Sequence, residues 1–95
     1  MKPPREIDGA VVIRWAEVSA DVLPTNRTRH VVEGEAEGPF AALAIGRYAD
    51  AEGYYLFYLD PSGDAVTDTH HDTVEGAVAQ ADYEYIGLTW RSTSE

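Results

Sequence analysis

The chain has 95 residues, 44% of them apolar, and its 17 acidic and 7 basic side chains give a formal net charge of −10. This length supports one domain around one hydrophobic core, and the absence of cysteine excludes disulfides and thiolate metal sites. The negative charge repels phosphate backbones and anionic membrane surfaces, so neither nucleic acids nor membranes are expected partners.

We expect a single domain over residues 10–91, after a flexible lead at 1–9 and before a tail at 92–95. The lead contains two prolines and a glycine, which is typical of poorly ordered termini. The domain begins with VVIRWAEVS at residues 11–19, a run of β-forming residues that predicts a strand. Regular alternation places Val11, Ile13 and Trp15 on one face of this strand.

The segment RTRHVVEGEAE at residues 27–37 alternates and predicts a second strand with one acidic face. That face carries Glu33, Glu35 and Glu37, spaced about 7 Å apart. One interpretation is an edge strand whose charges prevent aggregation. The other interpretation is an anionic surface for a basic protein partner.

Two further strands are predicted at residues 40–48 and 54–59. In FAALAIGRY, Leu43 and Ile45 share one face and small residues occupy the other. In YYLFYL both faces are apolar, which is typical of a central strand that is covered on both sides. The DPSGD sequence that follows matches a type I turn, so a hairpin with a second arm at 65–71 is expected.

A helix is predicted over residues 73–86. Asp72 and Glu75 have the spacing of a capping box at its start, and Gly87 is expected to be its C-terminal cap. Its apolar stripe consists of Val74, Ala77, Val78, Ala81 and Tyr85. A last strand is expected at 88–91. The predicted fold class is α+β, an antiparallel sheet of five or six strands with this helix packed on one face.

A helix of this length covers only part of one face of the sheet, because it is about 10 Å wide and strands lie about 4.8 Å apart. The second apolar face of residues 54–59 therefore needs another cover. Three covers are open: strong bending of the sheet over itself, the loop SADVLPTN at residues 19–26, or another copy of the chain. Tyrosine side chains suit an interface between copies, so we expect a homodimer.

The segments YYLFYLDPSGD, DTHHDT and EGAVAQADYEY together resemble a pattern of small uncharacterised bacterial proteins, in which such a hairpin leads straight into a short helix. The resemblance covers roughly residues 40 to 90. It implies a bacterial domain that stands alone. It supplies no activity and no catalytic residues.

The sequence TDTHHDT contains a candidate metal site. In an extended strand Asp68, His70 and Asp72 point to the same side, at a spacing from which they can meet one divalent ion. Ligands from one strand are nearly linear, so Glu75 or His30 would have to complete the set. The alternative is that Asp72 caps the helix, Asp68 faces solvent and one histidine packs at the hairpin edge. No cofactor is expected.

The distribution of charge supports a hypothesis about function. No Lys or Arg lies between Arg47 and Arg91, whereas nine acidic residues do. Asp82 and Glu84 lie near the predicted end of the helix, where carboxylates oppose the helix dipole. Residues that are unfavourable for local stability can mark a functional surface. The predicted partner-binding residues are Glu33, Glu35, Glu37, Asp82 and Glu84.

The sequence therefore predicts a non-enzymatic, acidic protein-binding module, such as an immunity-type inhibitor of a basic toxin or nuclease. Two alternatives stay open: a small metal-dependent enzyme or metal-binding protein that uses Asp68, His70 and Asp72, and a structural homodimer. The apolar runs are shorter than the roughly 20 residues that span a bilayer, and MKPPREIDGA lacks the apolar centre of a signal peptide. A cytoplasmic location is expected.

Overall fold

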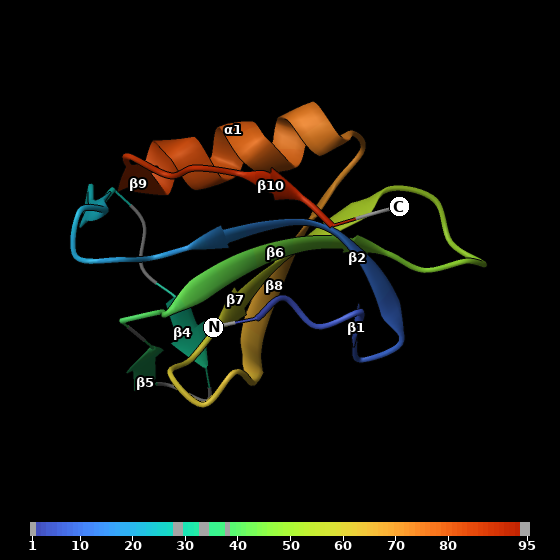
Figure 1. The fold of residues 1–95 in the computed structure, drawn as a ribbon, viewed down its shortest axis with the longest axis horizontal. Coiled ribbons are helices and arrows are strands. Elements are labelled where there is room, and N and C mark those ends of the chain that lie inside the picture. The colour runs from blue at the N-terminus through green and yellow to red at the C-terminus, as the bar shows by residue number, and fades with distance from the viewer. Residues whose placement is uncertain (1, 28–29, 33–34, 38, 94–95) are drawn as a thin grey trace.

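The computed structural model describes residues 2–27, 30–32, 35–37 and 39–93. Its centre is a curled antiparallel sheet with a helix, α1 (Val74–Glu84), on one face (Figure 1). In spatial order the strands are β1 (Glu6–Ile7), β2 (Ala10–Glu17), β6 (Ala42–Arg47), β7 (Tyr54–Leu59) and β8 (Ala65–His71), and β10 (Arg91–Ser92) also pairs with β2. Two small sheets join β3 (Leu23–Pro24) to β9 (Tyr85–Ile86) and β4 (His30–Val32) to β5 (Glu35–Glu37). The predicted α+β fold is confirmed.

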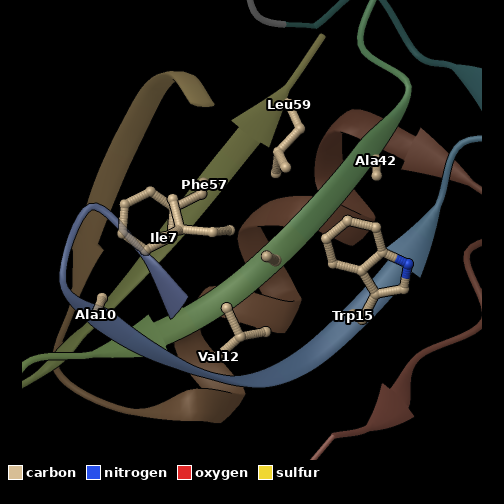
Figure 2. Close-up of a cluster of buried hydrophobic side chains, with 8 residues drawn as sticks. Ile7, Ala10, Val12, Trp15, Ala42, Phe57 and Leu59 are labelled. Carbon is tan, nitrogen blue, oxygen red and sulfur yellow. The ribbon is translucent and has the colours of Figure 1, made fainter. Parts of the chain in front are cut away.

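The central strand β7 is buried on both faces, as its two apolar faces predict. Phe57 and Leu59 belong to one cluster of buried side chains, and Leu56 and Tyr58 belong to another. The inner cluster, around which the sheet curls (Figure 2), consists of Ile7, Ala10, Val12, Trp15, Ala42, Ala44, Phe57 and Leu59. The helix cluster, which α1 closes, has the buried members Phe40, Leu43, Ile45, Leu56, Tyr58, Ala77 and Ala81.

The cover of the second face of β7 lies within the chain. In the sheet β1 is three positions away from β7, yet Ile7 packs in the same cluster as Phe57 (Figure 2). Such packing requires the sheet to bend over itself, which is one of the three covers considered above. Phe57 and Tyr58 are therefore buried without a second copy of the chain, whereas Tyr54 and Tyr55 are half-buried. The homodimer stays a prediction.

The flexible lead predicted at residues 1–9 is wrong in its second half. Residues 6 and 7 form β1, which pairs with the start of β2, and Ile7 is buried in the inner cluster. Asp8 and Gly9 form the tight connection, both with positive φ, at 50° and 88°. Aspartate and glycine tolerate this backbone conformation better than other residues, so the connection is compatible with the sequence.

The predicted alternation of β2 is interrupted by a β-bulge. Val12 pairs with Gly46 and Arg14 with Ile45, which leaves Ile13 as an extra residue. A bulge of this kind shifts the side chains that follow it by one position. Trp15 therefore joins the inner cluster while Ile13 packs against the helix cluster, and the prediction that these two side chains share a face is wrong.

Residues 27–37 do not form one continuous strand. β4 and β5 pair with each other in the antiparallel direction, with Val32 opposite Glu35, so the chain reverses between them. The prediction of one continuous strand is therefore wrong. Glu33 and the side chains of Glu35 and Glu37 lie outside the described part of the chain, so their role at an interface stays a prediction.

Small residues on β6 allow the close packing that the sequence predicts. Leu43 and Ile45 face the helix cluster, and Ala42 and Ala44, which alternate with them, face the inner cluster. A Cβ at Gly46 would lie 3.1 Å from the carbonyl oxygen of Val11 and 3.2 Å from Cε2 of Phe57. Glycine at this position therefore lets β2 and the Phe57 ring approach β6 together.

The turn between β7 and β8 forms as predicted. The side chain of Asp60 accepts hydrogen bonds from the backbone N–H groups of Ser62 and Asp64, at 2.9 and 3.0 Å. The N–H of Gly63 donates to the carbonyl of Asp60 at 2.9 Å, and its φ of 90° uses the freedom of glycine. Asp60 thus stabilises the hairpin from within the turn.

The ends of α1 differ from the prediction, although its packed stripe is confirmed. The N-cap is Thr73 and not Asp72, because Thr73 Oγ1 accepts the hydrogen bond from the N–H of Gly76 at 2.9 Å. The C-cap is Tyr85, which is already extended, and not Gly87. The strand expected at 88–91 is also wrong, because β9 lies before this range and β10 begins at its last residue.

Candidate functional site

The two acidic residues near the end of α1 have different environments. Asp82 is exposed, whereas Glu84 is only 4% exposed. Glu84 Oε1 accepts a hydrogen bond from the hydroxyl of Tyr58, which is fully buried on β7. The prediction that Glu84 belongs to an exposed acidic surface is therefore wrong. Of the five predicted partner-binding residues, only Asp82 is described as an exposed side chain.

A buried polar network connects α1 to the sheet. Besides donating to Glu84, Tyr58 hydrogen-bonds the side chain of Thr69 on the neighbouring strand β8. Thr69 Oγ1 in turn lies 2.7 Å from Nε2 of His71, which is half-buried. The network therefore runs from the end of β8 to the carboxyl group beneath the helix. Its hydrogen bonds satisfy polar groups that burial would otherwise destabilise.

The electrostatics around this network favour uncharged phenols and an uncharged imidazole. Burial raises the pKa of Tyr58, and the adjacent Glu84 carboxyl group raises it further, because the phenol would lose its proton next to a negative charge. Burial, followed by the effect of Glu84, raises the pKa of Tyr85 to about 12. Burial and the neighbouring His70 lower the pKa of His71. Because its members bond to one another, the network is suited to fixing α1 on the sheet.

We expect Tyr58→Phe to lower the free energy of unfolding by about 1–3 kcal/mol at neutral pH, because the buried Glu84 carboxyl group loses a donor while the ring still packs. The matched control is Tyr54→Phe, on the same face of β7, which should be nearly neutral because Tyr54 is half-buried beside Arg47, whose guanidinium carbon lies 5.9 Å from the ring centroid. Urea denaturation monitored by circular dichroism measures both variants. Equal losses in the two variants would contradict the role of the hydrogen bond.

The same variant has a signature at alkaline pH. The pKa of Tyr58 is raised in the folded chain and is about 10 in the unfolded chain. Its contribution to stability is therefore complete below about pH 10 and is lost as the pH rises above that value, because the unfolded chain releases the proton first. In Tyr58→Phe this alkaline loss of stability should become smaller, which a simple packing defect would not produce.

The three candidate metal ligands are not brought together. Asp68 and His70 are exposed on the face of β8 opposite α1, and Asp72 follows the end of that strand. In the part of the chain that the structure describes, no group of three or more His, Asp or Glu side chains is arranged to hold a metal ion. His70 instead packs edge-on against the ring of Tyr55, with ring centroids 5.0 Å apart. Gly53 makes room for this imidazole, because a Cβ there would overlap it.

Two features of the molecule were not found from the sequence. The pairing of Tyr58 with Glu84 joins residues 26 apart, and no local pattern indicates it. The burial of Glu84 could have been predicted, because Glu84 follows Ala77 and Ala81 at helical spacing and so continues their buried face. The second feature is the exposure of three apolar side chains near the end of α1: Leu23 and Ile86, which lie opposite each other, and Tyr83 in the last helical turn.

Comparisons with known proteins do not add to these observations. No protein-family model, no curated protein and no solved structure matches the chain. The resemblance to small bacterial proteins therefore remains a prediction. Among the described residues, no helix is long and apolar enough to cross a membrane. Any function must be argued from the surface and the buried groups of this chain.

Proposed function

We propose that this chain is a non-enzymatic binding module that holds a basic protein partner on its acidic surface. The observation that supports the proposal is an excess of exposed carboxylates. Nine acidic residues lie between Arg47 and Arg91 without any Lys or Arg among them, and seven of the nine are exposed. These seven are Asp50, Glu52, Asp64, Asp68, Asp72, Glu75 and Asp82.

Local stabilisation does not account for this excess. Glu75 lies in the first turn of α1, where a carboxylate is favourable, but Asp82 lies near the opposite end, and the last turn contains no basic residue. Among the described residues, none of the seven carboxylates forms an ion pair with Lys or Arg. Such a surface repels anionic molecules and attracts a partner of opposite charge. An immunity-type inhibitor of a basic toxin or nuclease is one subclass with this chemistry.

The test is affinity purification from the native host, followed by kinetics with the protein that is retained. We expect a stoichiometric basic partner that is bound at low salt and released near 1 M salt, where charges more than about 3 Å apart are screened. Neutralising Asp68 and Glu75 together, as Asp68→Asn and Glu75→Gln, should slow association at low salt about three- to tenfold, because long-range attraction sets the encounter rate.

The matched control carries the same change in net charge at another place. Glu6 and Asp8 are exposed near the start of the chain, so Glu6→Gln with Asp8→Asn should slow association less. Equal slowing by both pairs would mean that only the total charge matters. A retained partner that is acidic, or one that stays bound at every salt concentration, would contradict the proposal.

A further inference from the structure

Three exposed apolar side chains lie on the segments that meet at the C-terminal end of α1. Leu23 is 58% exposed and Ile86 is 60% exposed, and the two lie directly opposite each other in the β3–β9 pair. Tyr83, in the last turn of α1, is 48% exposed. We call these three side chains the apolar patch. Val11, on β2, is the other large hydrophobic side chain with comparable exposure among the described residues. Exposed apolar side chains that adjoin one another mark interaction sites, whereas isolated ones do not.

The backbone that presents the apolar patch is held firmly in place. The N–H of Thr25 donates to the carbonyl of Glu84 at 2.8 Å, and the Thr25 hydroxyl donates to the carbonyl of Tyr83 at 2.8 Å. These bonds satisfy carbonyls of the last helical turn, which have no partner within the helix. Val22 is buried directly before β3. A surface that is ordered before binding loses little entropy when a partner docks.

Acidic residues flank the apolar patch along the chain. Asp21, two residues before Leu23, and Asp82, directly before Tyr83, are both exposed, and the last turn of α1, at the negative end of the helix dipole, contains no basic residue. The described cation at this place is Arg27, whose guanidinium carbon lies 5.2 Å from the centroid of the Tyr83 ring. That stacking indicates that the ring accepts a guanidinium group, as electron-rich aromatic faces do.

We infer that Leu23, Tyr83 and Ile86 form the apolar centre of the interface with a basic protein partner, which places an apolar side chain on them and Arg or Lys side chains around them. This inference rests on the proposed function and adds where the partner docks. An apolar centre inside a charged rim is the usual anatomy of a protein interface, and a few central side chains supply most of its affinity.

The test is an NMR titration of the ¹⁵N-labelled chain with three synthetic peptides. The first alternates Arg and Leu, the second replaces Leu with Gly, and the third replaces Arg with Glu. We expect the first peptide to shift the amide signals of residues 23, 83 and 86 most strongly. The second should bind about tenfold more weakly, because the apolar contact is missing. The third should not bind, because its charge is repelled.

Variants locate the binding site independently of the chemical shifts. Leu23→Ser and Ile86→Ser, each made singly, should weaken binding of the Arg–Leu peptide about tenfold. Both substitutions remove exposed side chains, so each variant should still fold and give the NMR spectrum of a folded chain. Val11→Ser is the matched control, because Val11 is 48% exposed on β2, and its binding should be unchanged. Equal affinity of all three variants would overturn the inference.

The other outcomes separate this inference from the proposed function. If the Arg–Gly peptide binds as tightly as the Arg–Leu peptide, the inference fails while the proposed function stands. If neither basic peptide binds at low salt, both fail. If the Glu–Leu peptide binds equally well, the partner of the apolar patch is not basic. If the amide signals of residues 23, 83 and 86 shift with protein concentration alone, a second copy occupies the patch.

Discussion

Ala81→Asp is expected to cost several kcal/mol of the free energy of unfolding, enough to unfold most molecules of a domain whose total stability is about 5–15 kcal/mol. Ala81 is completely buried where α1 packs in the helix cluster. An aspartate there would place a carboxylate among Leu43, Ile45 and Leu56. A buried charge without a partner is among the few single changes that destabilise a protein this strongly.

The matched control for Ala81→Asp is Ala79→Asp, two residues earlier on the exposed side of the same helix. It makes the same chemical change and should cost less than about 1 kcal/mol, which is the difference in helix propensity. Urea denaturation of both variants measures the contrast. Similar midpoints would mean that α1 does not present Ala81 to the sheet.

Trp15→Ala is expected to lower the free energy of unfolding by about 3–5 kcal/mol, because a large, fully buried side chain leaves a cavity that the surrounding residues fill only in part. The Trp15 indole lies in the inner cluster with Val12, Ala42 and Leu59 (Figure 2). Val11→Ala on the same strand is the control and should be nearly neutral, because Val11 is exposed. Thermal melts monitored by circular dichroism measure both.

The same experiment tests how the second face of β7 is covered. If the curled sheet provides the cover, the loss in Trp15→Ala is independent of protein concentration. If a second copy provided it, stability would rise with concentration, because association stabilises the folded state by mass action. A loss below about 1 kcal/mol, or a marked dependence on concentration, would contradict the packing of the inner cluster.

The sequence predicts best where one period is maintained along an element. The period of two in β6 and β7 correctly assigns Leu43 and Ile45 to one cluster and Phe57 and Leu59 to the other. The period of 3.6 likewise identifies the packed stripe of α1. These patterns are local, because they follow from the geometry of the backbone and the burial of one face.

Predictions failed where a single residue or a distant partner decides the outcome. One extra residue, Ile13, reverses the faces of β2 after it, and alternation in the sequence does not indicate that insertion. Threonine and aspartate are both favourable N-cap residue types. Thr73 is the N-cap, and not Asp72, because the backbone becomes helical directly after Thr73. The candidate metal ligands are not grouped for a similar reason, since Asp72 lies beyond the end of β8.

The sequence by itself determined the antiparallel strands, the single packed helix and the excess of acidic side chains, because each depends on residue type and local spacing. Only the tertiary structure decided which of these acidic side chains reach the surface. Glu84 is buried because Tyr58, 26 residues earlier, offers it a hydrogen bond under α1, whereas Asp82 stays in solvent. The apolar patch also depends on the tertiary structure, because the pairing of β3 with β9 brings Leu23 beside Ile86, 63 residues later in the chain.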